Sequence, residues 1–69
     1  MTDIEIAKQL FTEGLNLIQN KEFEQAEKKF LKSLELIPNR ESVLNNLSSA
    51  QIKLGKYQDA KNQPQELLN

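Results

Sequence analysis

Apolar residues recur at intervals of three or four along most of this chain, which is the spacing of one face of an α-helix. Thr2 or Asp3 can cap the free amide groups at the start of a first helix, and Glu5 stands three residues after Thr2, as in a capping box. We expect this helix to end near Asn20 and Lys21, because asparagine tolerates a left-handed backbone. Its apolar positions are Ile6, Leu10, Phe11, Gly14, Leu17 and Ile18.

A second helix is predicted from about Glu22 to Ile37. It ends there because the residue before Pro38 resists the α-helical conformation. Charged residues separate the apolar positions, so one face of this helix should be buried and the other should face water. The apolar positions are Phe23, Ala26, Phe30, Leu34 and Ile37.

A third helix should begin between residues 40 and 42 and stop at Gly55, because glycine adopts a positive φ without steric cost. A fourth helix should begin near Tyr57 and be interrupted at Pro64, which removes a hydrogen bond and clashes with the preceding turn. We therefore expect an all-α fold of two antiparallel helix pairs, with the last helix short or bent. The expected buried positions of the third helix are Leu44, Leu47, Ala50 and Leu54.

The sequence also repeats itself at an offset of 34 residues. This internal match indicates two copies of one helix-turn-helix unit. Small residues stand at Ala26 and Ser33 of the first unit, where we expect two helices to cross closely. The matching pairs are Leu10 and Leu44, Phe23 and Tyr57, and Ala26 and Ala60.

In this spacing the chain resembles the tetratricopeptide repeat (TPR) family. The first unit carries the family's spaced residues at Gly14, Phe23, Ala26, Phe30 and Pro38. The second unit carries them at Leu44, Leu47, Gly55, Tyr57 and Ala60. It departs from the family at Pro64, which stands at the position that Phe30 holds in the first unit.

The resemblance implies one domain, 1–69, of stacked antiparallel helix-turn-helix hairpins, a fragment of a right-handed α-solenoid. Repeat one spans about 4–38, and repeat two spans about 39–69 and is truncated or altered after Asn62. Arrays of this kind usually need about three units to bury their faces. Three explanations stay open: a fragment of a longer array, self-association that supplies the missing helices, or a small stable monomer.

Composition narrows the classes of function. Nine basic and ten acidic residues give a net charge of −1, which argues against nucleic acid or a membrane surface as a partner. The sequence has no cysteine or histidine, and its carboxylates and serines lack a partner for acid–base or nucleophilic chemistry. We expect no enzyme, no cofactor and no metal. The acidic start and the absence of a long apolar run favour a cytoplasmic location.

The resemblance also implies that the first helix of each pair lines a concave groove. Phe11, Leu15 and Ile18 form an apolar stripe there, apart from the stripe expected to pack on the second helix. A helix with two apolar faces rarely leaves one in water. The occupant would be a partner's segment, a second copy of the chain, or the chain's own Leu67-Leu68. The predicted groove residues are Lys8, Phe11, Leu15, Ile18, Asn45, Asn46, Ser49, Ile52 and Lys53.

The sequence therefore predicts a protein–protein interaction module, a scaffold that binds a partner protein or peptide in an apolar groove. The alternative is a structural homo-oligomer in which a second copy completes the unfinished second repeat and no outside ligand is bound.

Overall fold

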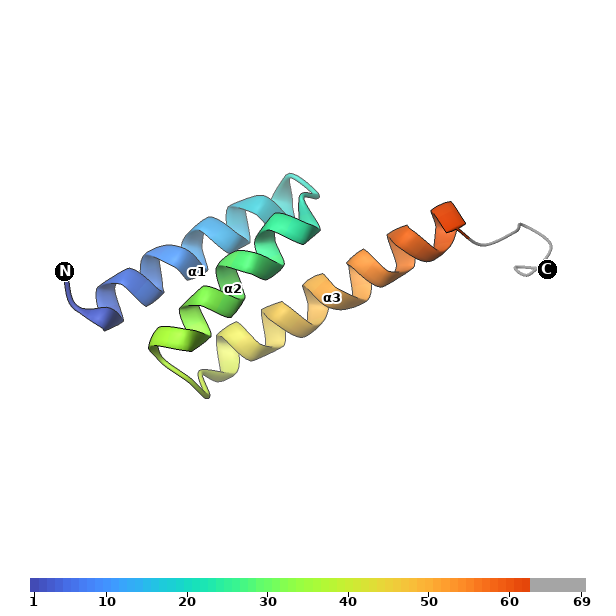
Figure 1. Cartoon of the computed structure of the whole chain (residues 1–69). Coiled ribbons are helices and arrows are strands. Elements are labelled where there is room, and N and C mark those ends of the chain that lie inside the picture. The colour runs from blue at the N-terminus through green and yellow to red at the C-terminus, as the bar shows by residue number, and fades with distance from the viewer. Residues whose placement is uncertain (63–69) are drawn as a thin grey trace.

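The computed structural model describes the backbone of residues 1–62 and the side chains of residues 1–55. Within residues 1–62 the chain forms helices and no strand, which confirms the all-α fold class for this part. The first two helices run antiparallel side by side, and the third lies along the other side of the second (Figure 1). The helices are α1 (Asp3–Gln19), α2 (Phe23–Leu36) and α3 (Glu41–Asn62).

The beginning of α1 is held by the predicted capping box. The amide and the hydroxyl of Thr2 both donate to Glu5 Oε1, at 2.9 and 3.0 Å, and the Glu5 amide donates to Thr2 Oγ1 at 3.2 Å. These bonds satisfy amide groups that would otherwise lack a partner at the helix start. The hydrogen bonds from the Thr2 amide and hydroxyl, with the nearby charge of Lys8, hold the pKa of the Glu5 carboxyl below its ordinary value.

The turn between α1 and α2 lies where the sequence predicts it but differs in its backbone. Asn20, the residue expected to be left-handed, has a φ of −88°, and Lys21 takes a φ of 62° instead. The amides of Lys21 and Glu22 then donate back to the carbonyls of Ile18 and Leu17, at 2.9 and 2.8 Å. These bonds satisfy carbonyl groups at the end of α1, which is the usual gain from a left-handed residue after a helix.

Phe30 of α2 lies at the centre of the fold and is fully buried. Its ring lies against Gly14 of α1, where an added Cβ would lie only 2.4 Å from Phe30 Cε1. The ring of Phe11 packs beside it, with the two ring centres 5.8 Å apart. Only glycine leaves room for the Phe30 ring at position 14, because any side chain there would displace the ring or separate the two helices.

A second contact between α1 and α2 is made by small residues. Ala7, Ala26 and Ser33 are all fully buried, and the Ser33 hydroxyl donates to the Ala7 carbonyl at 2.9 Å. The one fully buried polar side chain of the described residues thus has a partner, as buried polar groups require. The expected close contact is seen at Ser33, whose hydroxyl meets the backbone of α1, while Ala26 is buried in the cluster with Val43, Leu47 and Ala50 of α3.

The buried side of α3 is rotated relative to the prediction. Val43, Leu47 and Ala50 are buried and join the cluster around Phe30. Leu44 was expected to be buried with Leu47, but it is 40% exposed, so that expectation was wrong. Successive residues of a helix point about 100° apart, since a turn takes 3.6 residues. Because Val43 points toward α2, the next residue, Leu44, points away from it.

The third helix does not stop at Gly55. It continues to Asn62, and no glycine of the described residues has a positive φ. The expected turn at Gly55 and the separate helix from Tyr57 to Asn62 are therefore wrong. A glycine inside a helix costs roughly 1 kcal/mol relative to alanine, which does not end a helix whose flanking residues favour it. The expected interruption at Pro64 lies outside the described residues.

Two glycine-to-alanine substitutions should have opposite effects on stability. Gly14→Ala should lower the free energy of unfolding by roughly 1–3 kcal/mol, because the new Cβ would overlap the Phe30 ring. Gly55→Ala, the matched control, has no atom within 4 Å of the new Cβ, so it should raise that free energy by up to about 1 kcal/mol. Urea denaturation followed by circular dichroism measures both. A loss of stability in Gly55→Ala would mean that α3 is broken by a positive φ there.

The capping box should make the stability of the start of α1 depend on pH. A lowered pKa means that the folded state favours the ionised Glu5 carboxylate. The stabilisation of the helix start by this carboxylate should be complete above the ordinary pKa of a glutamate, and it should be lost as the pH falls through the lower pKa of the folded state. Titration of the Glu5 carboxyl by NMR should give a lower pKa than that of an unstructured glutamate. Glu5→Gln should remove this pH dependence, and an ordinary Glu5 pKa would contradict the capping box.

Candidate binding surface

The predicted groove residues of α1 lie beside the core. Phe11, Leu15 and Ile18 are each half-buried and pack against the buried cluster that joins α2 to α3. Phe11 does so through the Phe30 ring, at an angle of 46° between the ring planes. Lys8 is exposed one turn before them. Each of the three apolar side chains therefore stabilises the core with one edge and leaves another edge in water.

Two predicted residues of α3 lie on the flank that borders α1. Lys53 Nζ lies 5.8 Å from the centre of the Phe23 ring, within cation–π range. Phe23 stands seven residues before Phe30 and so shares the side of α2 on which Phe30 meets α1. Asn46 stands seven residues before Lys53 and shares its flank. Asn46 is half-buried, and its Nδ2 donates to the Ser42 carbonyl at 2.7 Å.

The other predicted residues of α3 are exposed. Ile52 is 58% exposed, an unusual state for a large apolar side chain near a small core. Asn45 and Ile52 are seven residues apart and lie on the side of α3 away from α2, with Ser49 between them. The structure therefore brings Asn46 and Lys53 toward the α1 stripe, whereas Asn45, Ser49 and Ile52 lie on the side of α3 away from α2 and are not gathered beside that stripe. We call the nine predicted residues the α1/α3 surface.

The α1/α3 surface carries two positive charges, at Lys8 and Lys53, and no carboxylate. No three acidic side chains of the described part of the chain lie close enough to hold a metal ion together. The helices described over residues 1–62 include none with the length and apolar character to cross a bilayer. The features that this surface offers to a ligand are therefore apolar side chains, two cations, and the amide and hydroxyl groups of Asn45, Asn46 and Ser49.

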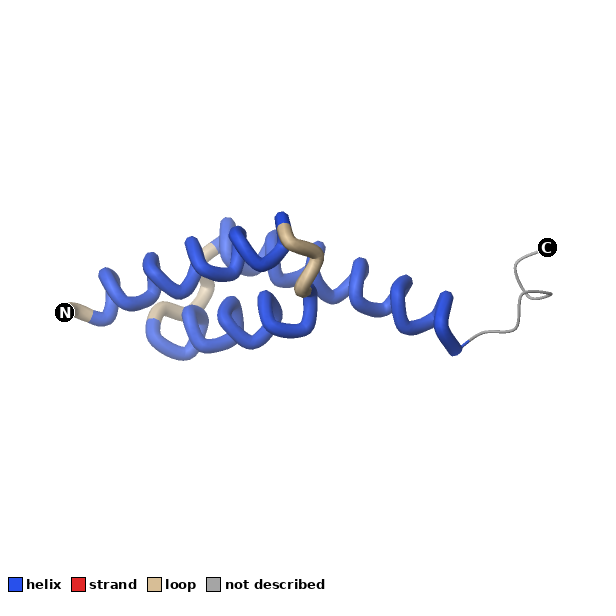
Figure 2. Tube along the Cα trace, turned by 90° about the horizontal axis from the view of Figure 1, so that it is seen from above, coloured by secondary structure: helices blue, strands red, loops and turns tan. Residues whose placement is uncertain are grey.

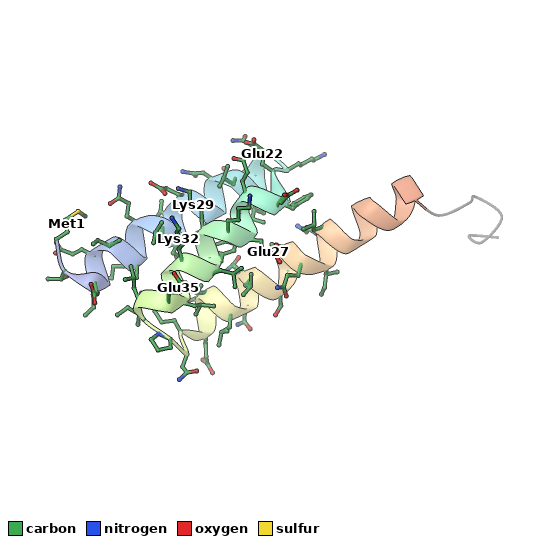
Figure 3. The ribbon with its side chains drawn as sticks, viewed as in Figure 1. Met1, Glu22, Glu27, Lys29, Lys32 and Glu35 are labelled. Atoms are coloured by element: carbon green, nitrogen blue, oxygen red, sulfur yellow. The ribbon has the colours of Figure 1, made fainter. Side chains whose placement is uncertain are left out.

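A second surface, on the opposite flank of α3, escaped the sequence interpretation. There Gln51 donates to Glu27 at 3.2 Å, and Figure 3 shows Glu27 on the edge of α2 that faces α3. Leu31 follows Glu27 by four residues and Leu44 precedes Gln51 by seven, so both lie on this flank. Leu31 is 45% exposed and Leu44 is 40% exposed. We call Leu31, Leu44, Ser48 and Gln51 the outer flank.

The sequence analysis missed this surface because it placed Leu44 with Leu47, Ala50 and Leu54 on one buried stripe of the third helix, whereas the structure buries Val43 on that side and leaves Leu44 exposed.

Comparison of the chain with models of known protein families, with curated proteins and with solved structures found no match. What the chain does must therefore be argued from its own residues and their arrangement.

Exposed and buried apolar residues of α3 should respond differently to truncation. Ile52→Ala should change the free energy of unfolding by less than about 0.5 kcal/mol, because most of this side chain is already in water. Leu47→Ala should lower it by roughly 2–5 kcal/mol through a cavity beside α2. Chemical denaturation measures both. Equal costs would mean that α3 is rotated about its axis relative to this structure.

Proposed function

We propose that this chain is a TPR-type interaction module that binds an apolar segment of another protein along the α1/α3 surface. One observation carries the proposal: Ile52 is 58% exposed, and Phe11, Leu15 and Ile18 keep an edge in water on the flank that Lys53 borders. Apolar side chains grouped along one surface and bordered by polar ones are typical of a docking site for a partner helix or extended segment.

The packing between α1 and α2 supports a TPR-type unit. Gly14 receives the Phe30 ring, and Ala26 and Ser33 are fully buried, at the positions that the resemblance implies. Such support concerns the fold, and a fold alone does not define a function. The binding role therefore rests on the exposed apolar residues, and the proposal assigns the chain no catalytic step and no cofactor.

The charges of the α1/α3 surface favour one kind of partner. Lys8 and Lys53 are its only charged residues, so an apolar segment that also carries Asp or Glu should fit best. Lys53 is held beside the Phe23 ring, which limits the directions in which its charge can point. Because both lysines are exposed, salt should weaken the electrostatic part of binding. A cytosolic site of action belongs to the same proposal and rests on the cysteine-free sequence.

A library of short displayed peptides, selected on the whole protein, tests this role. Recovered peptides should combine spaced apolar residues with Asp or Glu, and Ile52→Asp should weaken their binding by roughly tenfold or more. Lys32→Ala is the matched control, because Lys32 is exposed on α2, away from the α1/α3 surface (Figure 3). Binding that is unchanged by Ile52→Asp, or changed equally by the control, would rule out this surface.

A second candidate, structural self-association, is favoured by a separate observation. Leu31 and Leu44 lie exposed on the outer flank, on the other side of α3 from Lys53. The two roles use different sides of α3.

A further inference from the structure

One side of α3 is exposed to water and carries no charge. Every residue from Ser42 to Ile52 is uncharged, although most of them are exposed. Depletion of charged residues distinguishes the centre of a protein–protein interface from the rest of a protein surface. The exposed side of α3 therefore has the composition of an interface. The exposed side of α2, by contrast, carries Glu24, Lys28, Lys32 and Glu35.

Two large apolar side chains on this side of α3 stand in a symmetric pattern. Leu44 is 40% exposed and Ile52 is 58% exposed, and the exposed Ser48 lies midway between them in the sequence. Residues four apart on a helix form a ridge along its surface. The ridge sets one apolar side chain about 6 Å along the helix on either side of a small central residue. We call Leu44, Ser48 and Ile52 the α3 ridge.

No other helix within residues 1–62 covers the α3 ridge. α3 joins the core through Val43, Leu47 and Ala50, which point toward α2, and α1 makes only a brief contact with α3. In two views at right angles, the side of α3 away from α2 has no other helix of the described residues against it (Figures 1 and 2). The α3 ridge is therefore free to contact another molecule.

We propose that two copies of this chain pair through the α3 ridge, with their α3 helices antiparallel. Helices that pack through ridges of this kind cross at an angle of about 50°. This crossing brings the two Ser48 residues together at a two-fold axis and sets Leu44 of each copy beside Ile52 of the other. The same apolar contact is thus made twice. This inference does not depend on the proposed function.

Two properties of the α3 ridge favour a second copy over a foreign segment. A surface that meets itself across a two-fold axis brings each charge near its own counterpart, so such a surface must be uncharged close to the axis. The α3 ridge meets this requirement. Its symmetry about Ser48 also matches each Leu44 with an Ile52 of the other copy. A foreign segment would find no charge on this ridge that could recognise it.

Charge also determines the direction of the pairing. Glu41 stands at the beginning of α3, seven residues before Ser48. A parallel pair would bring both Glu41 carboxylates to the same end of the contact, where like charges repel. An antiparallel pair puts them at opposite ends, about 20 Å apart along the helix direction. The antiparallel pair is therefore the one without a repulsive contact between the two copies.

The contact is small, so the pairing should depend on protein concentration. The α3 ridge spans only about 12 Å of helix. Stable protein–protein interfaces bury about 1,200–2,000 Å² in total, more than one short helix crossing provides. Pairing covers Ile52 and leaves Lys53, which points to another side of α3, outside the contact. Because Ile52 also belongs to the α1/α3 surface, a partner segment that covers Ile52 should compete with the second copy.

A single introduced cysteine tests the pairing. The chain has no cysteine, so Ser48→Cys gives each copy one thiol, which lies at the proposed two-fold axis. Ser49→Cys is the matched control, because Ser49 is also exposed but points about 100° away. Since a disulfide requires close Cβ atoms, Ser48→Cys should form covalent dimers at least roughly tenfold faster than Ser49→Cys under the same oxidant. Equal rates overturn the proposal.

A mixture of two variants tests the direction of the pairing. Chains with Leu44→Cys are mixed with an equal amount of chains with Ile52→Cys and then oxidised. An antiparallel pair should give the mixed disulfide, between positions 44 and 52, in excess over random pairing. A random mixture, or an excess of disulfides between identical chains, overturns the antiparallel arrangement.

Light scattering over a concentration series supplies the independent test. The unmodified chain should form dimers as its concentration rises to about 1 mM, and Leu44→Lys or Ile52→Lys should weaken dimer formation by at least roughly tenfold while helical circular dichroism is kept. Ile4→Lys, the matched control, changes an isoleucine of similar exposure, 55%, on α1 and should leave the dimer intact. A chain that stays monomeric, or a dimer unaffected by Leu44→Lys, overturns the proposal. Peptide binding by Leu44→Lys tests the proposed function separately, because Leu44 lies outside the α1/α3 surface.

Discussion

The contact between Phe30 and Gly14 is the constraint on which the rest of this small fold depends. An added Cβ at Gly14 would lie within the Phe30 ring's van der Waals radius, so the ring fits only against a glycine. With Phe30 in that place, α2 packs on α1 through small residues and still presents its other side to Val43 and Leu47 of α3. A single aromatic ring thus joins all three helices, which suits a chain too short to build a second core.

The two flanks of α3 follow from this arrangement. α3 packs on α2 with one side only, and α1 touches it only briefly. One flank then borders α1 and carries Lys53 beside Phe23, while the other carries Leu44 and the bond from Gln51 to Glu27. Both flanks keep apolar surface in water, so both are suited to contact another protein. In our proposals the first holds a partner and the second holds another copy of the chain.

The local features of the first unit could be predicted from the sequence because each depends on residues close together. The capping box, the turn after α1 and the helix end before Pro38 are of this kind. The outcome at Gly55 could not be predicted in the same way. A glycine there is compatible with a turn or with a helix, and the difference depends on whether a later segment packs back onto α3. The wrong assignment of Leu44 is a separate matter of helix rotation, because the buried side of α3 includes Val43 instead.

The continuity of α3 through Gly55 is the claim on which the description of α3 as one helix with two exposed flanks depends. NMR of the whole protein measures it directly, through contacts between each α proton and the amide proton three residues later. A single helix predicts an unbroken series of these contacts from Glu41 to Asn62, with helical carbon shifts at Gly55 and Lys56. A gap in the series at Gly55, with a positive φ there, would show two helices joined by a turn and would contradict the account.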